Sequence, residues 1–202
     1  MTAATITIEP KGPLSQLQQH QFAAAQDRAQ KIRKAAAVAR FNGWTIGIFA
    51  VCSAPFALMS LPGFLMTSGM SIVAYVELKG RQRLLQFDRK ASAFLGWNQV
   101  GFLALILCYC IWMLAAGLTS DNPLAAELKA NPDLRAVFDS VDDFSQYYKI
   151  LVAAVYGTVI VLSVVFQGLN ALYYFTRRKH IIAYLQKTPT WVLDLQRTTA
   201  LT

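Results

Sequence analysis

Two long stretches without a single charged side chain limit what this chain can fold into. Residues 100–118 and 150–176 contain no Asp, Glu, Lys or Arg. A run of about 18 or more such residues, rising about 1.5 Å each as a helix, matches the hydrocarbon thickness of a bilayer, about 30 Å. A buried helix of a soluble core is the alternative. Because several such runs occur in a chain of only 202 residues, we expect membrane-spanning helices.

Composition supports the same conclusion. Apolar residues make up 55% of the chain and charged residues 15%, whereas charged residues make up about 25% of ordinary soluble domains. The net charge is +8, but the basic residues flank the apolar runs and do not gather on one face. This placement is typical of membrane flanks, and we expect no nucleic-acid partner.

The first apolar run is long enough for two spans. It covers residues 41–76, which would extend about 54 Å as one helix. Pro62-Gly63 is a turn signal, so we expect spans at 42–60 and 63–78 joined by a tight hairpin, with Pro55 kinking the first. A re-entrant pair that never crosses the membrane is the alternative.

The predicted fold is an all-α polytopic membrane protein with four transmembrane helices and amphipathic cytoplasmic helices. We divide the chain into seven segments. We expect 1–41 to be an Ala- and Gln-rich helical arm, 42–78 a transmembrane hairpin, 79–96 a basic amphipathic connector lying along the headgroups, and 97–118 the third span. We expect 119–149 to be an acidic outer loop with short helices, 150–173 the fourth span and 174–202 a basic tail.

The distribution of basic residues predicts the orientation. Segments 1–41, 77–96 and 174–202 hold 16 of the 19 lysines and arginines, whereas 119–149 holds three basic residues and six acids. Basic residues near span ends stay on the cytoplasmic side. We therefore expect both termini in the cytoplasm and the protein in a plasma or inner membrane.

The arm carries a heptad-like stripe of mostly small residues at 3-4 spacing. A helix lying in solvent or on the membrane surface is our preferred interpretation, and a short coiled coil with a partner is the alternative. The stripe consists of Phe22, Ala25, Ala29, Ile32, Ala36 and Ala39.

Candidate chemistry inside the spans is sparse. The only histidines, His20 and His180, fall in predicted aqueous segments, and all three cysteines lie inside apolar segments. We therefore predict no metal site, no haem or other cofactor, and no catalytic residue. Glu77 is expected at the cytoplasmic edge, paired with Arg81 at i, i+4 spacing, so that no span contains an interior acid.

Two groups of residues are candidates for contacts inside the membrane. Four amides form either a polar pocket between the third and fourth spans or, preferably, interhelical hydrogen bonds: Asn98, Gln99, Gln167 and Asn170. Small residues repeating every four positions are candidates for close helix packing, more within the chain than in a dimer. They are Gly43, Gly47, Gly63, Thr67, Ser71, Ala153 and Gly157.

The function that these patterns favour is a non-enzymatic assembly, scaffold or accessory subunit of a membrane complex, with a homo-oligomer or a membrane complex as partner. A small oligomeric transporter or channel is the first alternative, and an enzyme subunit using Glu77 and Asp88 at the headgroups is the second. Anionic headgroups, or a partner, are expected to contact Arg81, Arg83, Arg89, Lys90, Arg177, Arg178 and Lys179.

Overall fold

The computed structural model describes residues 14–119 and 141–199, and within these ranges it contains helices and no strand. In chain order the helices are α1 (Gln16–Met59), α2 (Leu61–Leu85), α3 (Ala91–Thr119), α6 (Val141–Lys187) and α7 (Thr190–Thr199). The first four are long and apolar enough to cross a membrane. The predicted all-α polytopic fold is therefore confirmed.

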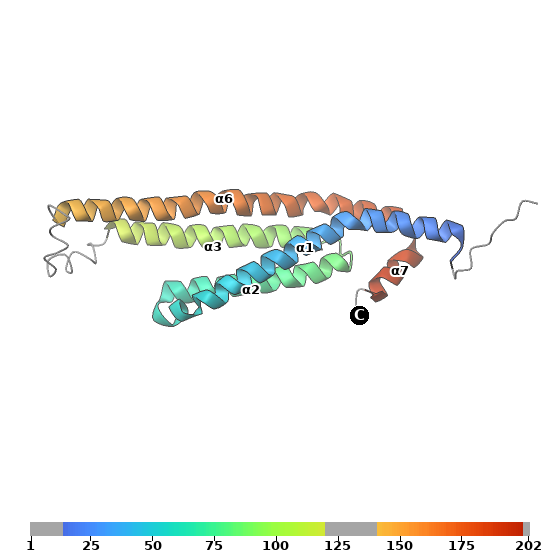
Figure 1. Cartoon of the computed structure of the whole chain (residues 1–202), viewed down its shortest axis with the longest axis horizontal. Helices are drawn as coiled ribbons and strands as arrows, with labels where there is room; N and C mark the ends of the chain where they lie inside the picture. The colour runs from blue at the N-terminus through green and yellow to red at the C-terminus, as the bar shows by residue number, and fades with distance from the viewer. Residues whose placement is uncertain (1–13, 120–140, 200–202) are drawn as a thin grey trace, which may run out of the picture.

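The four long helices form two hairpins that pack together (Figure 1). α1 lies against α2, and α3 lies against α6, while α2 also contacts α3 and α1 contacts α6. We call the end of the bundle where α1 begins, α2 turns into α3 and α6 meets α7 the terminal end. The opposite end, where α1 turns into α2, is the loop end.

Ser60 forms the entire connection between α1 and α2. Its backbone N–H donates to Phe56 O (3.2 Å), which ends α1, and its side chain accepts from Gly63 N (3.2 Å), which begins α2. Pro62 and Gly63 therefore belong to the first turn of α2, where a proline has no helical N–H bond to lose, and not to the turn predicted from the sequence.

The α2–α3 turn ends α2 with a left-handed residue. Phe87 has φ 56°, and the N–H groups of Phe87 and Asp88 donate to Leu84 O and Arg83 O (both 3.0 Å). This bonding is the Schellman pattern, which usually places glycine at the left-handed position. Here the Phe87 ring stacks on Tyr184 of α6, with centroids 4.5 Å apart, and this contact holds the strained residue in place.

Segment 79–96 therefore contains the end of α2, a short turn and the beginning of α3. The arm and the first span are one helix of 44 residues, and α6 has 47 residues, so it extends beyond 150–173 at both ends. Of the predicted outer loop, 120–140 lies outside the described residues, as do 1–13 of the arm and 200–202 of the tail.

The arm's stripe of small residues is buried inside the chain, which corrects our preference for a solvated or surface-lying helix. It packs at the terminal end against α6, α7 and the α2–α3 turn, in a cluster that includes Leu84, Tyr174, Ile181, Tyr184 and Val192. Alanine side chains let the α1 backbone approach these larger residues closely. Arg28 fixes the contact further, because its guanidinium donates to Lys187 O at the end of α6.

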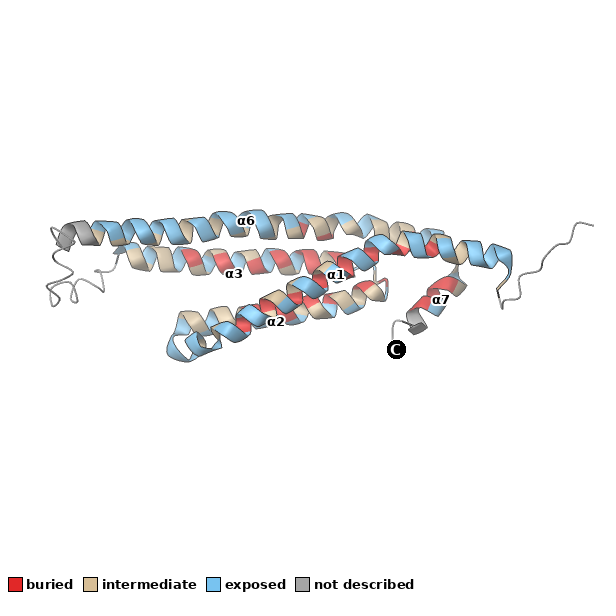
Figure 2. Ribbon diagram, in the orientation of Figure 1, coloured by how far each residue is buried: buried red, intermediate tan, exposed pale blue. Residues whose placement is uncertain are grey.

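Burial is concentrated at the terminal end and along the inner faces of α1, α2 and α3 (Figure 2). A second apolar cluster fills the middle of the bundle, built from Ile46 and Ala50 of α1, Val73 of α2 and Phe102 and Ile106 of α3. By contrast, no residue in the most apolar stretch of α6 is buried.

The close approach of α2 and α3 depends on Gly80. A Cβ atom at this position would lie 2.3 Å from Leu95 Cδ2 and 2.6 Å from Leu95 Cγ, and Leu95 is fully buried. We expect Gly80→Ala to lower the free energy of unfolding in detergent by about 1–3 kcal/mol, because the core around Leu95 becomes overpacked. Gly101→Ala is the matched control, because a Cβ at Gly101 meets no atom within 4 Å. Equal stabilities for the two variants would contradict this packing.

Candidate functional site

The candidate site is built around a carboxylate on the buried face of α2. Met70, Val73, Glu77, Gly80 and Leu84 recur every three or four residues and are all buried, so Glu77 occupies a position that this spacing normally gives to an apolar side chain. Its exposed fraction is 0%. Glu77 lies between the mid-bundle cluster and the terminal-end cluster.

Three neutral groups donate hydrogen bonds to this carboxylate. From α3, Asn98 Nδ2 and Gln99 Nε2 donate to Glu77 Oε1 at 3.0 and 2.6 Å. From α6, the Tyr174 hydroxyl donates to Glu77 Oε2 at 3.0 Å. We call Glu77, Asn98, Gln99 and Tyr174 the polar junction, since together they connect α2 to both helices of the other hairpin.

Tyr174 extends the junction to α1 and fixes α6 against α3. Its hydroxyl oxygen accepts a hydrogen bond from Asn42 Nδ2 of α1 at 3.4 Å. Its backbone carbonyl accepts one from the buried Ser92 hydroxyl of α3. All four long helices therefore contribute a polar group to this one level of the bundle.

Gly43 lets α1 come close to the carboxylate. A Cβ at this position would lie 2.9 Å from Leu78 Cδ2 and 3.2 Å from Glu77 Cβ. The absence of a side chain therefore brings the α1 backbone directly over Glu77 and closes the junction from that side.

Glu77 was expected at an aqueous edge, paired with Arg81, and the structure corrects both expectations. Its hydrogen bonds go to α3 and α6 because the inward face of α2 carries Glu77 and Gly80, while the next residue, Arg81, is partly exposed. The spacing of Glu77 from Val73 and Gly80 in the sequence indicates that Glu77 shares their buried face. The expected i, i+4 pair with Arg81 led us to place Glu77 at an aqueous edge instead.

The second alternative function used Glu77 together with Asp88, and the structure does not bring them together. Glu77 is enclosed in the junction, whereas Asp88 lies in the α2–α3 turn, where its side chain accepts a hydrogen bond from Lys90 N at 2.9 Å. Asp88 also lines a hollow of about 520 Å³ together with Arg89 and Leu185, and Glu77 is not part of that hollow.

The four predicted intramembrane amides do not form one pocket. Asn98 and Gln99 bind Glu77, and Asn98 Nδ2 also donates to Val73 O at 3.2 Å. The buried Gln167 Oε1 on α6 has no hydrogen-bond partner in the described part of the chain, and neither has Gln99 Oε1. Asn170 is partly buried on α6. The contacts of Asn98 and Gln99 are interhelical hydrogen bonds, but they reach α2 and not the fourth span.

The predicted small-residue rows serve different purposes. Gly43 and Gly47 face α2, and the Thr67 hydroxyl donates to Ser53 O of α1 at 3.2 Å. A Cβ at Gly63 would lie 2.4 Å from Phe56 O, so this glycine is required by the Ser60 turn. Ser71 bonds within α2. On α6, Ala153 is exposed and Gly157 has open space around it.

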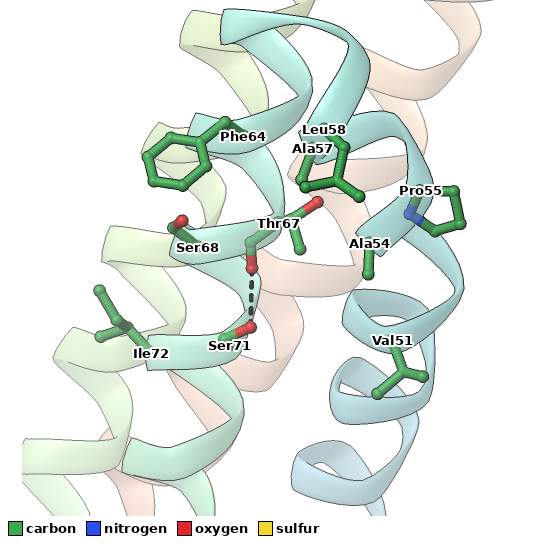
Figure 3. A pocket seen from close by; sticks show the side chains of 10 residues that line it. All are labelled: Val51, Ala54, Pro55, Ala57, Leu58, Phe64, Thr67, Ser68, Ser71 and Ile72. Carbon is green, nitrogen blue, oxygen red and sulfur yellow. Dashed lines mark hydrogen bonds between the residues drawn. The ribbon is translucent and has the colours of Figure 1, made fainter.

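An apolar groove of about 850 Å³ opens between α1 and α2 near the loop end (Figure 3). Ala54 and Leu58 of α1 and Phe64 and Ser68 of α2 are among its lining residues. Figure 3 shows these side chains on both helices together with the hydrogen bond from Ser71 to Thr67 O. The groove contains no charged residue, unlike the terminal end.

The predicted headgroup-contacting residues lie at the terminal end. Two of them stack on aromatic rings: the guanidinium carbon of Arg83 lies 4.6 Å from the centroid of Phe94, and that of Arg177 lies 4.4 Å from the centroid of Tyr173. The exposed members are Arg89, Lys90, Arg178 and Lys179, and Arg81 is partly exposed.

The charge of this end also acts on His180, which lies beyond the predicted fourth span. Burial, followed by the positive charges of Lys31, Arg177 and Lys179, lowers the pKa of the His180 imidazole. Lys31 belongs to α1 and the other two to α6, so basic side chains of both helices act on the same point. The terminal end therefore presents a concentrated positive surface.

In the described residues, no group of three or more His, Cys, Asp or Glu side chains is arranged to hold a metal ion. Cys52, Cys108 and Cys110 are free thiols. Comparison with known protein families, with curated protein sequences and with solved structures found no match for this chain. Its class is therefore defined by its own fold: an all-α polytopic membrane protein with a buried polar junction.

Asn98 offers the simplest test of the junction. Asn98→Ala removes hydrogen bonds to Glu77 and Val73, and we expect it to lower the free energy of unfolding in mixed micelles by about 1 kcal/mol. Asn170→Ala is the matched control, since no hydrogen bond from the Asn170 side chain to another helix occurs among the described residues. It should lower the free energy of unfolding by less than Asn98→Ala does. An Asn98 variant as stable as the wild type would show that these bonds contribute nothing.

Proposed function

We propose that this chain is a non-enzymatic subunit that assembles in the membrane, with a second copy or with a partner complex, through an outward face of α6. The face consists of Ala153, Gly157, Val161, Val164 and Gly168, spaced four, four, three and four residues apart. The observation that carries the proposal is the open space on this face. Among the described residues, a Cβ added at Gly157 or at Gly168 would meet no atom within 4 Å.

The glycines of α1 and α2 provide the comparison. Gly43 and Gly80 are close to side chains of neighbouring helices, so their small size is already used within the chain. The α6 face has the same type of residue without a neighbour, and Val161 between the glycines is 62% exposed. Rows of small and β-branched residues allow transmembrane helices to pack closely where lipid provides no hydrophobic driving force.

We further propose that the terminal end lies in the cytoplasm and the loop end outside, in a plasma or inner membrane. The concentration of basic residues in the three segments that reach the terminal end supports this orientation. The same residues, with Arg89, Lys90, Arg178 and Lys179 exposed, are suited to anionic headgroups, which attract basic side chains near the membrane surface.

Assembly can be tested by measuring the mass of the detergent-solubilised protein. We expect the wild type to be a dimer or larger, or to retain a partner, and Gly157→Leu to dissociate it, because a leucine fills the space that a neighbouring helix needs. Gly101→Leu is the matched control, since it fills open space on α3. A wild type that is strictly monomeric and without a partner, or equal effects of the two variants, would contradict the proposal.

A second candidate function is a small oligomeric transporter or channel, and one observation favours it. The buried carboxylate of Glu77 is the kind of group that ion-coupled transporters place inside the membrane, whereas we had expected Glu77 at the cytoplasmic edge. In this function the polar junction would be part of the transport path.

Flux into reconstituted vesicles tests this candidate. If the junction conducts or couples ions, a pH-sensitive dye should report proton flux that Glu77→Gln or Asn98→Leu reduces at least about tenfold, the size expected from losing one hydrogen bond to a charged group. Tyr173→Phe, next to the junction, should leave the flux unchanged. Equal flux for wild type and Glu77→Gln would remove this candidate.

A further inference from the structure

In the polar junction, both oxygens of the Glu77 carboxyl group have hydrogen-bond donors, but its negative charge has no described counter-ion. Its two oxygens accept hydrogen bonds from Asn98, Gln99 and Tyr174, as an ionised carboxylate requires. All three donors are neutral, so within the described part of the chain the negative charge has no cation among its hydrogen-bond partners. Burying an ion without a counter-ion is unfavourable, and such a group often takes up a proton instead.

Gln99 can supply the hydrogen-bond acceptor that a protonated Glu77 carboxyl would need. Gln99 is 1% exposed, and its Oε1 has no hydrogen-bond partner among the residues that the structure describes, while its Nε2 lies 2.6 Å from Glu77 Oε1. This distance is short for an N–H···O bond and typical of an O–H···O bond. Rotating the amide by 180° exchanges Nε2 and Oε1, and Gln99 then accepts a hydrogen bond from a protonated Glu77.

We propose that Glu77, Gln99 and Tyr174 form a proton-binding site that controls how tightly the two helical hairpins pack. Proton uptake places a hydrogen on Glu77 Oε1, and the Gln99 amide turns so that its oxygen accepts it. Proton loss restores three donors around one negative charge. The proton comes from water and returns to it, so the step involves no other reactant.

The site occupies a position from which such a change can spread. It joins α2 to α3 and α6, and through Tyr174 and Asn42 it reaches α1. The exposed Lys79 is two residues further along α2, so a basic side chain on the outer surface of the bundle lies within about one helical turn of the level of the carboxyl group. Because all three hydrogen-bond donors to Glu77 belong to the α3–α6 hairpin, a charge appearing at this level acts on contacts between the hairpins.

The other described groups around the Glu77 carboxyl do not provide another explanation for proton-dependent packing of the hairpins. From α3 it meets two amides and from α6 a phenol. On α1, Gly43 lies beside the Glu77 Cβ, and Asn42 donates to the phenol oxygen and not to the carboxyl. Tyr174 is the only titratable group among these described contacts, with the Tyr173 ring beside it at a centroid distance of 5.8 Å. Three donors directed at the carboxylate favour a proton as the ligand over a sodium ion, because a metal ion needs oxygen lone pairs directed at it.

Infrared spectroscopy of the purified full chain in lipid nanodiscs tests the site. Infrared spectra of the wild type and of Glu77→Gln are recorded over the same range of pH. Subtracting the spectra of the variant from those of the wild type isolates the carbonyl band of the protonated Glu77 carboxyl. We expect one titrating band in this difference. Tyr174→Phe should move its midpoint to higher pH by a factor of about ten in proton affinity, because it removes a donor that favours the ionised form.

Tyr173→Phe is the matched control and should leave the midpoint unchanged. Spin labels at Leu58→Cys and Leu118→Cys, in a background without the three native cysteines, report the distance between the hairpins. This distance should change over the same pH interval in the wild type and stay constant in Glu77→Gln.

If Glu77→Gln does not fold, Tyr174→Phe still tests the proposal in a chain that retains Glu77, through the shift of its carbonyl band. A carboxyl that does not titrate while the protein is folded would overturn the proposal. So would a midpoint unaffected by Tyr174→Phe, or a hairpin distance that responds to sodium concentration at constant pH and not to pH.

Discussion

The packing of the two hairpins depends on the hydrogen bonds that offset the cost of burying the Glu77 carboxylate. Moving a carboxylate out of water costs several kcal/mol even after relaxation, and each hydrogen bond to a charged acceptor returns about 1.5–3 kcal/mol. Three such bonds, from α3 and α6, are needed to offset that cost. The carboxylate belongs to one hairpin and all three donors belong to the other, so the hairpins are held together at the level where the charge is buried.

This arrangement divides the bundle into parts with different packing. At the terminal end, alanines of α1 pack against α6 and α7 in the larger apolar cluster, and Tyr184 of α6 bonds to Gln196 of α7. Toward the loop end, α6 exposes most of its apolar residues. Lipid or a second transmembrane helix can cover such a surface, whereas water cannot without a large cost. This exposed apolar surface of α6 is the one that the proposed assembly would use.

The sequence was sufficient for the fold class and for the presence of four long apolar helices, because uncharged runs of membrane length leave few alternatives. It was less successful where one helix continues through a predicted boundary. The arm and first span merge because alanine-rich sequence continues the helix without a stop signal, and Pro62-Gly63 fits the first turn of α2 as well as a turn between helices. Such boundaries depend on tertiary contacts that local sequence does not specify.

The candidate site was predictable only in part. Asn98 and Gln99 were identified as polar residues inside a span, but their partner was not, since Glu77 stands next to a basic segment and was interpreted as part of it. Asn42, Ser92 and Tyr174 contribute through contacts 82 to 132 residues apart in the chain. No periodicity in one helix reveals such contacts. Residues 120–140 of the predicted acidic outer loop (119–149) lie outside the described residues, so the short helices expected there remain a prediction.

A double-mutant cycle on Glu77 and Tyr174 tests most directly whether this contact joins the hairpins. The free energies of unfolding would be measured in the same mixed micelles for the wild type, Glu77→Met, Tyr174→Phe and the double variant. We expect the two substitutions to be non-additive by about 1 kcal/mol or more, because either one alone breaks the same bond. Additivity within about 0.5 kcal/mol would mean that the two side chains do not depend on each other, and would contradict the junction as the contact that holds the fold together.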